Sequence, residues 1–271
     1  MENLQYTRNW KQENIVVTIG KTKVGREHFL LAAGPCAAEN SKQMAGISAM
    51  LKDSPVKLLR GGAFKPRTSP YSFQGLGKDG LELLRQTADI LNIPLVTEVT
   101  DLKHLELVSR YADALQIGSR NMAAYELLKE VGQQSKPILL KRGMAATTKE
   151  FLYAAEYVAS GGNEQLILCE RGIRSFDPEF RNILDLNAVA LLKERTPFPV
   201  IVDPSHGSGR SDAVLPLSLA AAAAGADGVM VEIHPSPETA LSDGDQSLSM
   251  ENFRIWTERV SHLAQFLGKT V

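Results

Sequence analysis

The sequence predicts a single (β/α)8 (TIM) barrel with a short N-terminal β-hairpin. From about residue 29 onward, eight short runs rich in Val, Ile and Leu alternate with amphipathic stretches. Near-continuously apolar strands that alternate with helices are typical of parallel β/α units, whose strands are buried on both faces. Eight such units favour a closed barrel, and no GxGxxG or P-loop motif supports an open nucleotide-binding sheet.

The chain is predicted to divide into an N-terminal extension, residues 1–28, and a barrel, residues 29–271. In the extension, Ile15–Ile19 is predicted to pair with Val24–Phe29 across the loop Gly20–Lys23. The barrel strands are predicted at residues 29–35, 56–59, 95–99, 114–118, 138–142, 166–171, 200–204 and 228–233. Helical patterns between and after them include residues 80–91, 102–111, 125–131, 149–159, 182–194, 215–224 and 250–267.

The composition of the 271 residues argues against several classes of function. A net charge of −1 argues against nucleic acid as the main partner, because binding to a phosphate backbone requires a clear positive excess. Cys36 and Cys169 form no CxxC pair, so neither a disulfide framework nor a structural zinc site is predicted. The N-terminus lacks an apolar signal region and no segment is long enough to span a bilayer, so we expect a cytoplasmic protein without a membrane partner.

The most informative stretch is Lys57–Tyr71, in which a short apolar run leads into a basic loop. Its cations and hydroxyls suit phosphate and carboxylate groups, because Arg offers a planar fork and Lys a movable point charge. A solvated surface loop is the ordinary alternative for such a cluster. The position directly after a buried strand, and a Gly-Gly pair that lets the backbone approach a ligand, favour a binding site instead. Its candidate residues are Arg60, Lys65, Arg67, Thr68 and Ser69.

Each predicted strand ends in a chemically useful side chain, at the face of the barrel where active sites are built. These side chains are Cys36, Arg60, Glu98, Arg120, Lys141 with Arg142, Glu170 with Arg171, Asp203 with His206, and Glu232. One group could hold a divalent transition metal with an open coordination position: Cys36, His206, Glu232 and either Asp243 or Asp245. A second group is a ring of cations suited to a highly anionic small substrate: Arg60, Lys65, Arg120, Lys141 and Arg171.

A lone Cys or His in a core is more often a packing residue than a ligand, so the metal hypothesis depends on convergence of all four positions. Cys169 is expected to pack in or beside a strand, and His28, His104 and His262 to lie in the extension or on helix surfaces. His234 adjoins Glu232 and is expected next to the metal ligands rather than among them.

Motifs throughout the barrel resemble 3-deoxy-D-arabino-heptulosonate 7-phosphate (DAHP) synthase of type I, β-subfamily. The matching segments are GPCAAE (34–39), RGGAFKPRTSPYSFQGLG (60–77), TEV (97–99), QIGSRN (116–121), LLKRG (139–143), CERGIR (169–174), DPSHGSGR (203–210), VEIHPSP (231–237) and ALSDGDQ (240–246). The resemblance implies a metal-dependent enzyme that condenses phosphoenolpyruvate with erythrose 4-phosphate, the first step of the shikimate pathway of aromatic amino-acid biosynthesis.

The resemblance also implies residue roles. It assigns the metal to Cys36, His206, Glu232 and Asp243, and the ion could be manganese, iron, cobalt or zinc. Phosphoenolpyruvate would be bound by Arg60, Lys65, Arg120, Lys141 and Arg171, and the aldose phosphate by Arg67, Thr68 and Ser69. Lys65 is expected to take part in catalysis, and the group that activates water is left open between Glu98, Lys141 and His206.

Relatives in this family imply a homo-oligomer, a dimer or tetramer. Because only about 28 residues precede the barrel, we expect no feedback regulation by an added domain.

Three other functions remain open at this point. They are 3-deoxy-D-manno-octulosonate 8-phosphate synthase, whose loop typically reads KANRSS instead of KPRTS, a Schiff-base aldolase with Lys141 as nucleophile, and a catalytically silent sugar-phosphate-binding barrel.

Overall fold

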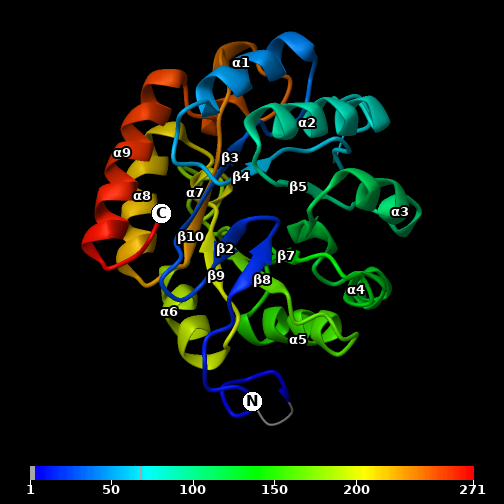
Figure 1. The fold of residues 1–271 in the computed structure, drawn as a ribbon, viewed down its shortest axis with the longest axis vertical. Coiled ribbons are helices and arrows are strands. Elements are labelled where there is room, and N and C mark those ends of the chain that lie inside the picture. Colours follow the sequence, from blue (N-terminus) through cyan, green and yellow to red (C-terminus); the bar gives the residue numbers. More distant parts are fainter. Residues whose placement is uncertain (1–3, 68) are drawn as a thin grey trace.

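A computed structural model describes residues 4–67 and 69–271 of the chain; the predicted binding residue Thr68 lies outside the described residues. Eight parallel strands form a closed barrel, as predicted, in the order β10-β3-β4-β5-β6-β7-β8-β9 (Figure 1). Their bounds are β3 (Leu30–Gly34), β4 (Leu58–Arg60), β5 (Leu95–Glu98), β6 (Ala114–Ile117), β7 (Ile138–Lys141), β8 (Leu166–Glu170), β9 (Val200–Val202) and β10 (Gly228–Glu232).

Helices surround this barrel and cover the outer faces of its strands (Figure 1). They are α1 (Ser41–Leu51), α2 (Lys78–Leu91), α3 (Leu102–Tyr111), α4 (Tyr125–Gly132), α5 (Thr148–Ala159), α6 (Leu186–Arg195), α8 (Ser211–Ala223) and α9 (Met250–Phe266). Shorter helical elements lie in the loops after the strands: η1 (Ser119–Asn121), α7 (Pro204–Ser208), η2 (Pro237–Thr239) and η3 (Gly244–Gln246). Local sequence explains sharp helix starts such as that of α5, where Thr147 and Glu150 form a reciprocal capping box.

Two helix starts differ from the predictions by more than two residues. The helix expected over residues 182–194 begins only at Leu186, after the cap Asp185. The residues before it are extended, because Ile183 forms an antiparallel bridge with Ile173 across the loop that follows β8. The helix expected over residues 215–224 begins earlier, at Ser211, and ends where Gly225 adopts a positive φ, as its sequence predicts.

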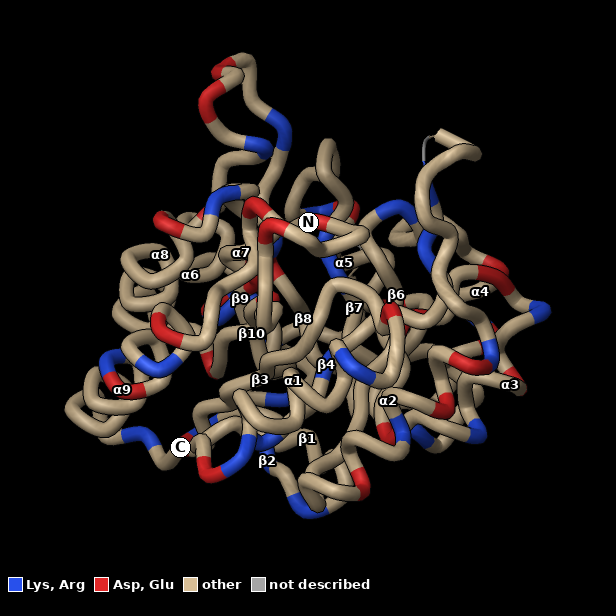
Figure 2. The backbone as a smooth tube through the Cα atoms, turned by 90° about the horizontal axis from the view of Figure 1, so that it is seen from above, with Lys and Arg blue, Asp and Glu red and all other residues tan. Residues whose placement is uncertain are grey.

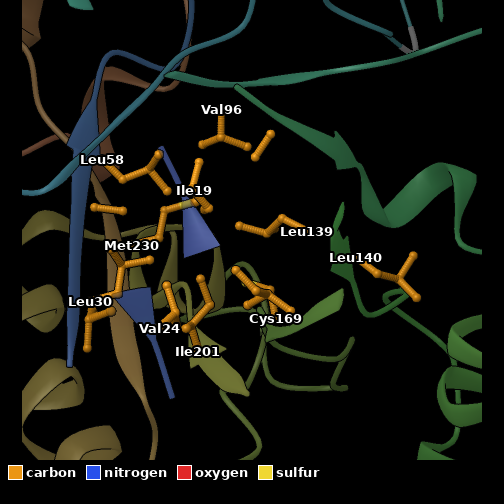
Figure 3. Packing of buried hydrophobic residues seen from close by; sticks show 14 of the residues in the cluster. Ile19, Val24, Leu30, Leu58, Val96, Leu139, Leu140, Cys169, Ile201 and Met230 are labelled. Carbon is orange, nitrogen blue, oxygen red and sulfur yellow. The ribbon is translucent and has the colours of Figure 1, made fainter. Parts of the chain in front are cut away.

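The N-terminal hairpin closes the amino end of the barrel. Strands β1 (Val17–Ile19) and β2 (Thr22–Val24) pair antiparallel across the two-residue loop 20–21, so the predicted four-residue loop and the pairing out to residue 29 are wrong. Gly20 takes φ +57, which permits this tighter turn. The apolar side chains of the hairpin are fully buried, and Figure 3 shows Ile19 and Val24 beside Leu30 and Met230.

The remaining cysteine and histidine predictions concern packing. Cys169 is fully buried within the apolar cluster of the barrel, as predicted, and neither cysteine is in a disulfide (Figure 3). His104 lies on α3 and stacks on Phe64 with ring centroids 4.1 Å apart, and His262 is exposed on α9. No helix within residues 4–67 and 69–271 combines the length and the apolar composition that crossing a bilayer requires.

Candidate active site

A pocket lies at the carboxyl end of the barrel, where the loops after the strands meet. Charged side chains dominate its wall, which consists of Arg60, Lys65, Pro66, Arg67, Glu98, Gln116, Gly118, Ser119, Arg120, Lys141, Met144, Arg171, Arg181, His206 and Asp243. Elsewhere, basic and acidic residues are interspersed over the outer helices (Figure 2). The positive charge that the sequence concentrates in strand-end loops is therefore gathered inside one cavity.

The four predicted metal ligands converge beside this pocket from four separate places in the chain: Cys36 after β3, His206 in α7, Glu232 at the end of β10 and Asp243 in the loop that follows. The donor atoms of Cys36, Glu232 and Asp243 all lie within 4.8 Å of one another. His206 completes the group, since its Nε2 lies 3.5 Å from Glu232 Oε1 and 4.0 Å from Asp243 Oδ2. Asp245, the alternative carboxylate, is exposed. The structure thus brings together one sulfur, one nitrogen and two carboxylates, a donor set that fits a divalent transition metal.

Asp243 reaches this position through an unusual backbone conformation. Its φ of 54° lies in the left-handed region, which Asp tolerates better than most residues. The carboxyl group is held on several sides: the Cys36 thiol donates to its Oδ2 at 3.2 Å, and Arg181 Nη1 lies 3.5 Å from its Oδ1. A strained backbone held by surrounding contacts is typical of a functional position.

Burial and neighbouring charges shift the pKa values of Cys36, Asp243 and His206. Burial, with Glu232 nearby, raises the pKa of the Cys36 thiol to about 12, so a bound cation would have to displace its proton. Burial alone would raise the pKa of Asp243, but His206 and Arg181 outweigh burial and lower it. Burial lowers the pKa of His206 below its usual value, which favours the neutral imidazole that a metal requires.

Asp203 orients His206 for this role. The Nδ1 of His206 lies 2.7 Å from Asp203 Oδ2, and a carboxylate only accepts hydrogen bonds, so Nδ1 carries the proton and Nε2 faces the other ligands. The same Asp203 oxygen accepts from Lys141 Nζ. Arg60 Nη1 similarly donates to Glu232 Oε1 at 2.9 Å. The predicted metal group and the predicted cation ring are therefore one hydrogen-bonded network.

The cations differ in how much of their charge is already matched. Lys65 Nζ lies 3.0 Å from Cys36 Sγ, and Arg60 and Lys141 are paired with carboxylates. Within residues 4–67 and 69–271, no carboxylate oxygen lies within 4.0 Å of Arg120 or Arg171. Arg171 is buried, and its only hydrogen bond to a described residue is a long one to its neighbour's carbonyl. Arg120 and Arg171 are thus the pocket cations with the most charge to offer a ligand.

Glu98 lines the same pocket and accepts a 3.4 Å hydrogen bond from Gln116. Gly118 makes room for it: a Cβ at position 118 would lie 2.1 Å from Glu98 Oε1. The glycine of the QIGSRN segment is therefore required by the close approach of this carboxylate.

The predicted aldose-phosphate residues are placed unequally. Arg67 lines the pocket, donates to Ser242 Oγ and lies 4.0 Å from Asp243 Oδ1. Ser69 is exposed and is not part of the pocket wall; its hydroxyl accepts from the backbone N–H of Tyr71. Of the two described residues predicted to bind the aldose phosphate, Arg67 therefore lies at the pocket and Ser69 does not.

Some strand-end residues face away from the pocket. Arg142 pairs with Glu170 and Asp185, both at 2.9 Å, and Glu170 is fully buried. Side chains of neighbouring strand residues point to opposite faces, so Arg142 points outward where Lys141 points inward. Sequence reasoning also missed Arg181, which lies in an irregular loop, and Gln246, which lies in η3. A basic residue nine positions after the CERG motif was the available signal for Arg181.

His234 lies next to the metal group, as predicted, and helps to hold the loop that carries Asp243. Its Nε2 lies 3.5 Å from Glu39 Oε2, and the other oxygen of Glu39 accepts from the backbone N–H of Leu241 at 2.8 Å. Leu241 is two residues before Asp243. Glu39 and His234 therefore tether the loop that carries one metal ligand.

Comparison with known proteins shows the family. A family model described as the DAHP synthetase I family matches residues 11–266. The chain belongs to this family. The phospho-2-dehydro-3-deoxyheptonate aldolase of Thermotoga maritima is 48% identical over 98% of this chain and 78% of its own length, and its crystal structure superimposes with a TM-score of 0.95. A truncated form of the Thermotoga maritima DAHP synthase is 44% identical, covers 98% of both chains and has a TM-score of 0.92.

A second group of relatives is more distant. The 2-dehydro-3-deoxyphosphooctonate aldolase of Francisella tularensis subsp. holarctica is 33% identical over 89% of this chain and 94% of its own length. The predicted family resemblance to DAHP synthase is thus confirmed, whereas the β-subfamily assignment stays a prediction.

Proposed function

We propose that this DAHP synthetase I family member is a metal-dependent DAHP synthase. It joins phosphoenolpyruvate, erythrose 4-phosphate and water into 3-deoxy-D-arabino-heptulosonate 7-phosphate and inorganic phosphate. The observation that carries the proposal is the convergence of an S/N/O/O donor set with a ring of cations in one pocket. The 48% identity to the Thermotoga enzyme supports the same reaction.

The pocket residues divide the binding work. Arg120 and Arg171 lack carboxylate partners within the described chain, so they bind the phosphate and carboxylate of phosphoenolpyruvate with charge-assisted hydrogen bonds. Lys141, which also lines the pocket, adds a third cation. Arg67, on the KPRTS loop at the outer side of the metal group, binds the aldose phosphate. Holding both substrates in line removes much of the entropic cost of the bimolecular step.

The metal group is formed by Cys36, His206, Glu232 and Asp243. A divalent cation held there would supply Lewis-acid polarisation of the aldehyde, and manganese, iron, cobalt and zinc all suit this donor set. Lys65, 3.0 Å from Cys36 Sγ, stabilises the thiolate that such a cation requires. Asp203 keeps His206 in the tautomer whose Nε2 is free to act as a ligand.

The carbon–carbon bond forms between C3 of phosphoenolpyruvate and the aldehyde carbon of the aldose. Water adds at C2, and cleavage of the C2–O bond then releases inorganic phosphate. The water must lose a proton. Because His206 Nε2 is directed at the metal ligands, Glu98 is the group best placed to receive it, whereas Lys141, paired with Asp203, can only donate or relay a proton.

A Schiff-base mechanism at Lys141 fits the geometry less well. Schiff-base formation needs a neutral, nucleophilic amine, and Lys141 is engaged in a buried ion pair with Asp203. The octulosonate synthase reaction is the alternative that the Francisella relative represents, at 33% identity. The KPRTS loop and the higher identity to the Thermotoga enzyme favour erythrose 4-phosphate over arabinose 5-phosphate.

One experiment tests the whole proposal. The purified protein is mixed with phosphoenolpyruvate and either erythrose 4-phosphate or arabinose 5-phosphate, with and without a chelator, and phosphate release is followed. We expect release with erythrose 4-phosphate, loss on chelation and recovery on adding a divalent metal. Full activity of the metal-stripped protein, or a preference for arabinose 5-phosphate, would contradict it. Light scattering after size-exclusion chromatography tests the proposed dimer or tetramer.

A further inference from the structure

Arg181 is a pocket cation that the assignment above leaves without a role. It lies in the loop between β8 and α6, and its side chain is 37% exposed. One guanidinium nitrogen, Nη1, donates to Gln246 Oε1 at 2.8 Å and lies 3.5 Å from Asp243 Oδ1. Its Nε and Nη2 make no hydrogen bond to any residue in the described part of the chain. Most of its donors therefore remain available to a ligand in the pocket.

The backbone around Arg181 is held firmly against α7. The backbone N–H of Arg181 donates to Ser208 O at 2.9 Å, and the amide of Asn182 donates to His206 O at the same distance. Gly209, at φ +76, leaves space for the arginine, since a Cβ there would lie 2.5 Å from Arg181 Cβ. Arg181 is thus a positioned side chain, fixed relative to His206, rather than a mobile surface cation.

Arg181 and Arg67 approach the same carboxylate oxygen. Their Nη1 atoms lie 3.5 and 4.0 Å from Asp243 Oδ1, so these two nitrogens are no more than 7.5 Å apart. A charge-assisted hydrogen bond to a phosphate oxygen is about 2.8 Å long, so one phosphate group between the two guanidiniums reaches both. The pair comes from loops after β4 and β8, on either side of the metal ligand Asp243.

The charge of the substrate requires such a second cation. A sugar phosphate carries a charge near −2, and Ser69 of the KPRTS loop is exposed outside the pocket wall. Arg67 lines the pocket, and Lys65 of the same loop is already held against the Cys36 thiol at 3.0 Å. We propose that Arg181 binds the aldose phosphate together with Arg67 and so selects a phosphorylated aldose over a neutral one. This inference rests on the proposed function of the pocket.

Arg181 is also linked to the metal ligands, and the test must separate that structural effect from phosphate binding. Gln246 accepts from Arg181 and donates through Nε2 to Glu232 Oε2 at 2.6 Å, so a purely structural role of Arg181 would act through this metal ligand. Phosphate binding affects only phosphorylated aldoses, whereas misplaced metal ligands slow every aldehyde. The unphosphorylated sugar erythrose is therefore the discriminating substrate.

The variant is Arg181→Gln, with Arg210→Gln as matched control. Arg210 is exposed, pairs with Asp212 and packs over the ring of Phe180 beside the same loop, outside the pocket wall. We expect Arg181→Gln to raise KM for erythrose 4-phosphate by between about 10- and 100-fold, with KM for phosphoenolpyruvate and metal affinity unchanged. Arg181→Lys should recover part of the loss, and Arg210→Gln should behave as the wild type.

With erythrose at high concentration, kcat/KM should be the same in the wild type and in Arg181→Gln. An equal fall on both aldoses, or an unchanged KM for erythrose 4-phosphate, would overturn the inference. Calorimetric Kd values for erythrose 4-phosphate give the same comparison without turnover. Calorimetry measures binding without turnover. A wild-type protein that binds erythrose 4-phosphate but does not react would therefore refute the proposed function, whereas the Kd values of wild type and Arg181→Gln would still decide the role of Arg181.

Discussion

At the amino end of the barrel, the hairpin buries a layer of apolar side chains, Val17, Ile19 and Val24; at the carboxyl end, Arg60 and Lys141 are buried almost as deeply. The first layer needs no polar partner, because removing apolar surface from water is itself favourable. The second is tolerable because Arg60 and Lys141 each have a carboxylate beside them. The amino end thus stabilises the barrel, and the carboxyl end holds charges that a substrate and a metal are expected to use.

The largest expected difference is between substitutions of the two cysteines, one in the metal group and one in the apolar cluster. Cys36→Ser removes the sulfur donor from the metal group, and we expect turnover to fall by more than about 100-fold, beyond the usual effect of losing an outer-shell partner. Metal content by mass spectrometry should fall in parallel. Cys169→Ala, in the apolar cluster, should cost about 1 to 2 kcal/mol of stability yet keep metal and activity. Loss of metal from Cys169→Ala alone would contradict the assignment.

A smaller effect is expected when single substrate-binding cations are removed. Arg171→Ala should raise KM for phosphoenolpyruvate by between about 10- and 100-fold, since Arg171 has no carboxylate partner in the described chain. Arg67→Ala should raise KM for erythrose 4-phosphate instead. Steady-state kinetics with each substrate varied in turn measures both. Equal effects of both variants on both substrates would refute the division of labour.

A still smaller effect is expected at the tether of the Asp243 loop. Glu39→Ala removes the acceptor for the Leu241 N–H and should weaken metal affinity by about tenfold, while kcat at saturating metal is retained. Glu39→Gln is the matched control, because its amide oxygen can still accept that hydrogen bond. Metal titration followed by activity distinguishes the two variants, and identical affinities would show that the tether is not needed.

The smallest effect on activity is expected at the amino end. Ile19→Ala opens a cavity under the hairpin and should lower the free energy of unfolding by about 2 to 4 kcal/mol with unchanged KM values. Thr18→Ala, on the exposed face of the same strand, should leave stability nearly unchanged. Urea unfolding and steady-state kinetics provide the two measurements. A raised KM in Ile19→Ala would mean that the two ends of the barrel are coupled.

Local pattern was sufficient for the barrel and for much of the site. Apolar runs of strand length indicate strands that are buried on both faces. Because parallel strands need helical crossovers, eight such runs that alternate with helices predict a closed barrel. Since all carboxyl ends then meet at one face, Cys36, His206, Glu232 and the cations could be expected together before any contact was known.

Tertiary structure decided what local periodicity does not encode. The bridge between Ile173 and Ile183 delays α6, and the left-handed backbone of Asp243 selects it over Asp245 as the inward carboxylate. Arg181 enters the pocket from an irregular loop, whose path depends on docking against α7. The sequence by itself determined which elements form and which chemistry gathers at the barrel mouth, because these follow from side-chain period and strand direction. The pairing of each carboxylate with its cation depends on contacts between loops that are distant in the sequence. Only the folded chain sets these contacts.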